Sequence, residues 1–213
     1  MNYKQVYGVT EAFEQAICEY TGAPYCVAVD SCSSALLLSL WASNIRDEAI
    51  IIPDRTYMSV PCSIIISGNK VRFYPVSGTT LKGMYELEPT GIWDCALRFT
   101  ADMYLPGSIM CLSFSGVYKH LKLGKGGAIL TDSEEAYKWF KKARFSGRNE
   151  CSYHTDTFTQ LGLNCYMLPE IAARGLLLMN QFYNFDGTKK DMPDVELPYP
   201  DLSKFPIYTI GKF

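Results

Sequence analysis

One lysine lies in a segment where its amine could do chemistry. Lys119 belongs to the stretch SFSGVYKHLKLGKGG (113–127), between two runs that predict strands, and its neighbours are mostly aromatic, apolar or glycine. Most lysines lie on the surface and have no chemical role. A partly desolvated lysine can nevertheless be neutral enough to form an imine, and its amine can later move a proton. Lys119 is therefore a candidate nucleophile and general acid–base.

Two further polar positions follow strand-like runs. The segment DSCSS (30–34) precedes a helical run, and free N–H groups at a helix start can bind an anion. Serines there can equally be plain helix caps. Asp94 ends the run GIWD (91–94), where a carboxylate could hold the protonated ring nitrogen of a pyridine cofactor. It could equally cap the following turn, so both alternatives stay open at both positions.

Strand and helix patterns alternate along the chain and must position these residues. Short apolar runs predict strands at 25–29, 49–52, 71–74, 91–94, 109–114 and 127–131. Helical periodicity predicts helices at 10–20, 34–43, 58–67, 133–144 and 169–182. The stretch 77–90 has turn chemistry with little periodicity, and the tail ends in a possible strand at 207–210. The alternation predicts an α/β fold with a mainly parallel sheet, whose ligands bind beyond the carboxyl ends of the strands.

Composition excludes several classes of protein. The chain has 213 residues, 48% hydrophobic and 20% charged, with a net charge of −2. This balance is typical of a globular protein and argues against nucleic-acid binding. No apolar stretch is long enough to span a membrane, and the N-terminus lacks a signal core. Eight scattered cysteines, none in a CxxC pair, indicate reduced thiols of a cytoplasmic protein, and the two histidines have no cysteine partners for a metal site.

Five segments resemble a known family in the same order, over about residues 9–183. They are VAVDSCSSALLLSL, IIIPDRTYMSV, IWDCAL, SFSGVYKHLKLGKGGAILTD, and the pair GRNE with LGLNCYMLPEIAARGLL. Together they are similar to the DegT/DnrJ/StrS family of sugar aminotransferases, which use pyridoxal 5′-phosphate (PLP). The resemblance implies the type-one PLP-transferase fold, a three-layer α/β large domain, with the active site at the interface of a homodimer.

The resemblance also implies a role for individual residues. Lys119 would carry the cofactor as a Schiff base, and Asp94 would hold the pyridine nitrogen. Tyr57 would stack on the cofactor ring. The remaining positions concern the phosphate: Cys32, Ser33 and Ser113 would hold it, and Asn164 would reach the phosphate of the neighbouring subunit.

The chain also departs from the family pattern. Leu97 stands where the family has a glutamine or histidine that contacts the ring oxygen, and Tyr166 stands where it has an arginine. The stretch 77–90 replaces a longer segment with another strand and helix. We therefore expect a reduced PLP-binding large domain at 1–185 and a proline-rich tail at 186–213, the remnant of a largely missing C-terminal small domain.

These features predict a PLP-dependent aminotransferase. It would move an amino group from a donor such as glutamate to a keto group of a nucleotide-linked sugar, without a metal, nucleic acid or membrane. Two alternatives remain at this point. One is another PLP reaction, such as elimination or decarboxylation, on an unrelated substrate. The other is a scaffold that keeps the fold without catalysis.

Overall fold

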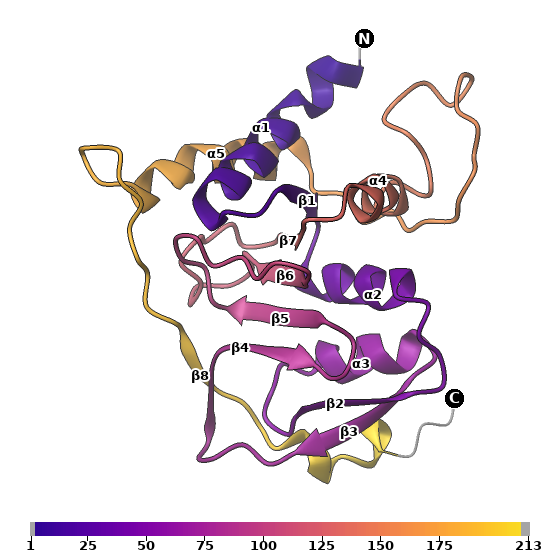
Figure 1. Ribbon diagram of the computed structural model, residues 1–213, viewed down its shortest axis with the longest axis vertical. Helices are drawn as coiled ribbons and strands as arrows, with labels where there is room; N and C mark the ends of the chain where they lie inside the picture. The colour runs from indigo at the N-terminus through magenta and orange to yellow at the C-terminus, as the bar shows by residue number, and fades with distance from the viewer. Residues whose placement is uncertain (1–2, 210–213) are drawn as a thin grey trace.

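The structure, a computed structural model, describes residues 3–209 and is built around one main sheet. The order of its six strands is β1-β7-β6-β5-β4-β8, and the pair β2-β3 lies beside β4 (Figure 1). The strands are β1 (Tyr25–Val29), β2 (Ala49–Pro53), β3 (Lys70–Tyr74), β4 (Thr80–Leu87), β5 (Ile92–Leu97), β6 (Ile109–Ser113), β7 (Gly127–Thr131) and β8 (Glu196–Pro198). The α-helices are α1 (Tyr3–Thr21), α2 (Cys32–Ala42), α3 (Ser59–Ile66), α4 (Glu134–Ala143) and α5 (Pro169–Met179), and short 3-10 helices are η1 (Asn180–Phe182), η2 (Leu202–Lys204) and η3 (Pro206–Tyr208).

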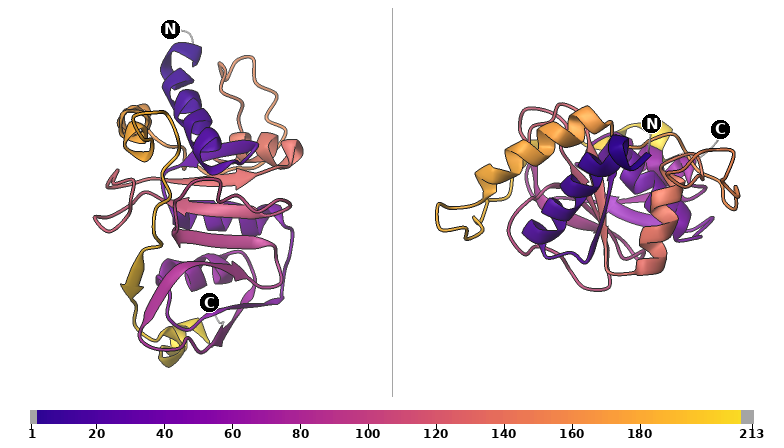
Figure 2. Two further views of the ribbon diagram at one scale, coloured as in Figure 1. Left: turned by 60° about the vertical axis from the view of Figure 1, so that its left-hand side comes forward. Right: turned by 90° about the horizontal axis from the view of Figure 1, so that it is seen from above.

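Helices cover both faces of the sheet. α2 and α4 pack on one face and α3 lies beside α2, whereas α1 and α5 lie side by side on the other (Figure 2). Side chains of successive strand residues point to opposite faces. In β1, Val27 and Val29 belong to the core under α2, whereas Cys26 and Ala28 belong to the core under α1 and α5. Burial on both faces explains why this strand is a continuous apolar run in the sequence.

The predicted three-layer α/β fold is confirmed, with one correction to the strand pairing. Among the strands that the structure describes, β5–β6 and β2–β3 pair in parallel, and the other neighbours pair antiparallel. The reason is that β7 and β4 run against the strands on either side of them. β1, β2, β3, β5 and β6 nevertheless point the same way, because two antiparallel steps restore the direction. Their carboxyl ends therefore meet at one edge, as the sequence analysis expected for a ligand site.

Three local predictions are wrong. The strand expected at 91–94 does not end at Asp94, because β5 continues to Leu97. The stretch 77–90 contains β4, in which Leu81, Tyr85 and Leu87 are buried. Gly83 stands where the alternation calls for a fourth apolar side chain, which hid the strand from the pattern. The expected strand at 207–210 is instead η3, which Pro206 begins, while residue 210 lies outside the described part.

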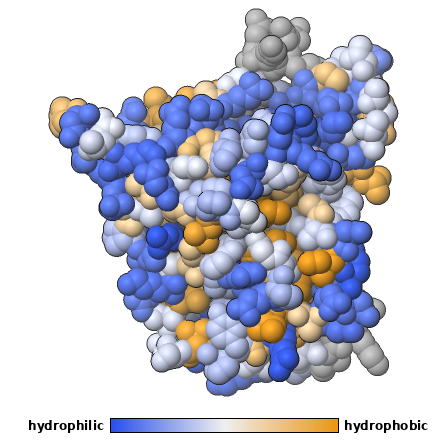
Figure 3. All heavy atoms as spheres, in the orientation of Figure 1, coloured by the Kyte–Doolittle hydropathy of each residue, from blue (hydrophilic) through white to orange (hydrophobic). Residues whose placement is uncertain are grey.

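The first helix begins seven residues earlier than expected, since α1 starts at Tyr3 and not at Thr10. The other helices and the thiols agree with expectation. α4 is amphipathic, and its N-cap Ser133 accepts a hydrogen bond from the Ala136 N–H. All eight cysteines are free thiols. Within residues 3–209, no helix is long and apolar enough to cross a bilayer. Apolar side chains on the face shown in Figure 3 are most frequent in its middle and lower part.

Candidate active site

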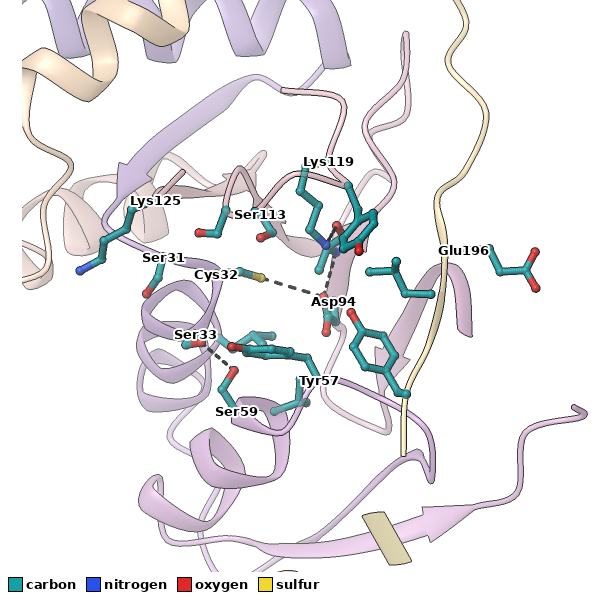
Figure 4. A pocket seen from close by; sticks show the side chains of 18 of the residues that line it. Ser31, Cys32, Ser33, Tyr57, Ser59, Asp94, Ser113, Lys119, Lys125 and Glu196 are labelled. Carbon is teal, nitrogen blue, oxygen red and sulfur yellow. Dashed lines mark hydrogen bonds between the residues drawn. The ribbon is translucent and has the colours of Figure 1, made fainter. Parts of the chain in front are cut away.

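A cavity of about 800 Å³ lies where the carboxyl ends of β1, β2 and β6 meet the middle of β5. Figure 4 shows its side chains converging from α2, α3, the loop after β2, β5 and the loop after β6. Of the seven residues that the sequence singled out, six line this cavity: Cys32, Ser33, Tyr57, Asp94, Ser113 and Lys119. The structure thus brings together residues that lie far apart in the chain.

One end of the cavity is formed by the first turn of α2. Ser31 is the N-cap and accepts a hydrogen bond from the Ser34 N–H, and Cys32 and Ser33 follow it. The first N–H groups of a helix have no partner inside the helix, and the helix dipole adds positive potential there. The Ser33 hydroxyl donates to Ser59 Oγ at 2.6 Å, which brings the start of α3 to the same place. This end of the cavity therefore suits an anion.

A glycine allows β7 to approach this helix start. A Cβ atom on Gly127 would lie 2.5 Å from the Cys32 amide nitrogen and from the Ser31 carbonyl carbon. Both contacts are with backbone, which cannot move aside as a side chain can. The glycine at this position in the GKGG sequence therefore has a steric reason.

Asp94 is a buried carboxylate at the centre of the cavity, with 4% of its surface exposed. Its Oδ2 accepts a hydrogen bond from the Tyr85 hydroxyl at 2.9 Å, and its Oδ1 accepts one from the Ala96 N–H at 2.8 Å. The Cys32 thiol lies 3.9 Å from Oδ1. Burial raises the pKa of Asp94, and these hydrogen bonds together with the charge of Lys119 offset only part of that effect.

Lys119 reaches into the same cavity from the loop after β6. Its Nζ donates to the carbonyl oxygen of Ala96 at 2.5 Å, beside Asp94 (Figure 4). Burial lowers the pKa of Lys119, and the negative charge of Asp94 opposes this shift. A lowered pKa increases the fraction of neutral amine, which is the nucleophilic form.

Tyr57 forms a wall of the cavity and leaves 49% of its surface exposed. Its ring lies below Asp94 and Lys119 in Figure 4, and its centroid is 6.4 Å from that of the Tyr199 ring. Leu97, by contrast, is buried at 2% exposure. Its hydrocarbon side chain can form no hydrogen bond, whereas the family pattern has a glutamine or histidine at this position.

Asn164 is the one predicted site residue that does not line the cavity. It is exposed, and its backbone bridges to Phe145. Nearby, the ring of Tyr166 packs edge-on against Tyr7 at 5.9 Å and Phe145 at 5.1 Å. Tyr166, which replaces an arginine of the family pattern, therefore makes aromatic contacts here.

Several residues that line the cavity were missed from the sequence. They are Ser59, Ser115, Tyr118, Lys125 and the segment Glu196–Tyr199. Ser59 and Lys125 lie close in sequence to predicted site residues, and that proximity was an available signal. The segment 196–199 is far from every motif, and no local pattern shows where a proline-rich tail returns.

The comparisons with known proteins agree with this geometry. Residues 2–86 and 105–194 match the model of the DegT/DnrJ/EryC1/StrS aminotransferase family. The chain belongs to this family, so the resemblance seen in the sequence is confirmed. The unmatched gap contains Asp94, and its position in the cavity therefore rests on the structure.

Individual relatives have low sequence identity to this chain. A UDP-4-amino-4,6-dideoxy-N-acetyl-β-L-altrosamine transaminase of Campylobacter jejuni is 22% identical over 249 residues, which cover 94% of this chain and 63% of the relative. AtS13 from Actinomadura melliaura has a similar structure, with a TM-score of 0.70 and 22% identity over 81% of this chain and 59% of its own. NtdA from Bacillus subtilis, solved with bound cofactor PMP, has a TM-score of 0.62 and 22% identity over 80% and 47% of the two chains. The chain thus spans less than two thirds of the length of these relatives.

Proposed function

We propose that this chain binds PLP and acts as an aminotransferase. The observation that carries the proposal is the meeting of four groups in one cavity: an amine with a lowered pKa, a buried carboxylate, an exposed aromatic ring and the start of a helix. Each group matches one part of PLP in its chemistry. The family membership and the PMP bound to NtdA support the same cofactor.

The residues present fit the parts of this cofactor. Lys119 would hold it covalently through Nζ, and Tyr57 would stack on its ring. Asp94 would accept a hydrogen bond from the ring nitrogen. Cys32, Ser33 and Ser113 would surround the phosphate at the start of α2, where backbone N–H groups can bind it.

When bound, PLP supplies an electron-withdrawing ring that stabilises negative charge on the substrate carbon. The ionised carboxylate of Asp94 favours a protonated ring nitrogen, which strengthens that withdrawal. Lys119 Nζ can accept and return a proton as a general acid–base, and its lowered pKa increases the fraction of neutral amine that can do so. The chain therefore supplies both the proton carrier and the charge that the reaction needs.

We further propose glutamate as the amino donor and a nucleotide-linked keto sugar as the acceptor. The transaminase from Campylobacter jejuni is named for a UDP-linked amino sugar, and this name supports the acceptor class. A spectroscopic half-reaction tests both substrates. Glutamate should shift the absorbance of the loaded protein, and a keto sugar should restore it. A loaded protein that releases CO2 or ammonia from an amino acid without restoring an amine would instead indicate decarboxylation or elimination.

The role of Lys119 is tested by chemical labelling. Borohydride reduction of the loaded protein should leave the mass of the cofactor on the peptide that contains Lys119. Lys119→Arg should abolish this label, whereas Lys122→Arg, a nearby variant outside the cavity lining, should keep it. A label on Lys122 or Lys125 would overturn the assignment, and a purified protein that binds no PLP would favour the scaffold alternative.

We also propose a homodimer with shared active sites. Asn164 is exposed and lies outside the cavity of its own chain, which leaves it available to a second subunit. Large apolar side chains in the same region and in the loop before Lys119 are also exposed: Val117, Tyr118, Phe158, Leu161 and Leu168. Exposed apolar surface of this kind usually marks an interface. Light scattering should give twice the chain mass, and a monomer with undiminished cofactor affinity would refute the proposal.

A further inference from the structure

The cavity has one wall that lies outside the residues matched to the family. The family match ends at residue 194, yet Glu196, Leu197, Pro198 and Tyr199 all line the cavity. We define residues 194–202 as the C-terminal strap. The strap crosses the molecule from the side of β5 to the loop after β2 (Figure 1).

Main-chain hydrogen bonds fix the strap before it reaches the cavity. β8 pairs antiparallel with the start of β4 over Thr80–Lys82, and the Val195 N–H donates to the Leu97 carbonyl at 2.8 Å. Two hydrogen bonds of 3.1 Å join Arg98 to the carboxylate of Asp194. The first residues of the strap are therefore attached to β4 and β5, the strands that carry Tyr85 and Asp94.

The strap is also fixed after the cavity. Arg55 donates to the carbonyl oxygen of Tyr199 at 2.9 Å, and the Leu202 N–H donates to the carbonyl of Asp54 at 2.7 Å. Leu202 is itself buried, with 2% exposure. Tyr199 therefore lies between two attachment points, and the second one is the loop that also carries Tyr57. Such a segment is a wall of the site.

Tyr199 is the residue of the strap with chemistry to offer. Its ring stands at 67° to that of Tyr57, and the rings are 6.4 Å apart between centroids. Burial raises the pKa of Tyr199 to about 12, with a smaller contribution from the charge of Asp94. The hydroxyl therefore keeps its proton at physiological pH and can donate a hydrogen bond. Glu196 differs, because its carboxylate points away from Asp94 (Figure 4).

We propose that Tyr199 is a cofactor-contacting residue, which closes the ring end of the pocket and donates a hydrogen bond to the bound PLP. The proposal rests on the proposed function of the same cavity. The strap would thereby give the cofactor ring a polar contact, whereas the hydrocarbon side chain of Leu97 can form no hydrogen bond with it. The strap would thus supply, from a segment outside the family match, part of the contact surface for the cofactor.

The test is a titration of the cofactor-free full chain with PLP and, separately, with pyridoxamine 5′-phosphate, followed by absorbance. Tyr199→Phe keeps the ring and should weaken both affinities about three- to tenfold, the range of one neutral hydrogen bond. Tyr199→Ala also loses the ring contact and should weaken them further. Tyr208→Phe is the matched control, because Tyr208 belongs to the same tail outside the cavity lining, and should leave both affinities unchanged.

The melting temperature of each cofactor-free variant separates contact from folding. Tyr199→Phe should melt as the wild type does, so its weaker binding would reflect the lost hydroxyl contact. Wild-type affinity in Tyr199→Phe, or an equal loss in Tyr208→Phe, would overturn this inference while leaving the proposed function intact. A wild-type chain that binds neither compound would overturn both.

Discussion

Asp94→Asn should separate the role of Asp94 toward the cofactor from its role in the fold. Asparagine has nearly the same shape, so the test removes the charge and keeps the volume. In the wild type, Asp94 accepts hydrogen bonds from Tyr85 and from the Ala96 N–H, and Tyr85 in turn lies 2.6 Å from Thr56 Oγ1. Since Tyr85 donates to Asp94, Thr56 must be the donor to Tyr85.

The network can rearrange around asparagine and keep its three hydrogen bonds, with Ala96, between residue 94 and Tyr85, and between Tyr85 and Thr56. The asparagine oxygen can keep the Ala96 N–H, and its NH2 group can donate to the Tyr85 oxygen. Tyr85 then turns its proton toward Thr56 Oγ1, which can accept it. The variant also avoids burying a charge. We therefore expect the free energy of unfolding of the cofactor-free variant to lie within about 1 kcal/mol of the wild type at pH 8.

The pH dependence of this comparison has a definite sign. Because burial raises the pKa of Asp94 in the folded state, folding favours its protonated form more than the unfolded chain does. The stability that it contributes is present below the unfolded value of about 3.9 and is lost as pH rises through the folded pKa. Asp94→Asn should remove this loss, so the variant should gain stability relative to the wild type as pH rises.

Cofactor binding should respond in the opposite direction. A hydrogen bond to a charged group is worth about 1.5–3 kcal/mol, so its loss should weaken affinity for pyridoxamine 5′-phosphate roughly 10- to 150-fold. Urea unfolding at pH 5 and pH 8 and absorbance titration provide the two measurements. A variant that loses several kcal/mol of stability but keeps wild-type affinity would show that Asp94 only holds the fold.

Three further predictions concern the scaffold. The guanidinium of Arg144 is buried between Glu14 and Glu150. Arg144→Met should therefore lower the free energy of unfolding in urea by about 3–5 kcal/mol, because it leaves buried carboxylates without this partner. The control Lys138→Met removes an exposed cation and should have little effect. Burial favours a higher pKa for Glu150, but the charges of Arg144 and Lys141 lower it overall; wild-type stability should therefore fall as pH drops below about 4.3, more steeply than that of Glu150→Gln. Gly127→Ala places a Cβ atom against the start of α2 and should reduce both melting temperature and phosphate affinity; normal values for both would contradict the close approach.

The convergence of the site could be predicted because every motif except that of Asp94 lies at the end of a strand or follows it. Cys32, Tyr57 and Ser113 come after β1, β2 and at the end of β6, and these strands point the same way even where β7 separates them. Lys119 follows β6 in the same manner. The direction of the strands, which repeated apolar runs and intervening helices indicate, was therefore enough to place these residues at one edge. Their roles toward the cofactor stay predictions.

The pairing of strands could not be predicted in the same way. A parallel sheet needs a crossover between neighbours, and the helices α2 and α3 provided that pattern. β4 has no helix before it and enters the sheet antiparallel, between β5 and β2. Its interior Gly83 interrupts the apolar alternation, and a Cβ there would lie 2.5 Å from the Asp194 carboxylate. The close approach of Asp194 therefore requires glycine at position 83, and this glycine interrupts the apolar pattern by which β4 could have been predicted.

β4 explains why the partner of Asp94 and the position of the tail both escaped prediction. Tyr85 of β4 donates to Asp94, and the first residues of the same strand pair with β8. The strand therefore orders the central carboxylate from one end and attaches the strap, with Tyr199, from the other. Local periodicity predicts neither contact. One is a single side-chain hydrogen bond, and the other involves β8, which has only the three residues Glu196–Pro198. If Tyr199 contacts the cofactor, β4 links the two sides of the pocket physically, and a variant that loosens its pairing should weaken cofactor binding from both sides at once.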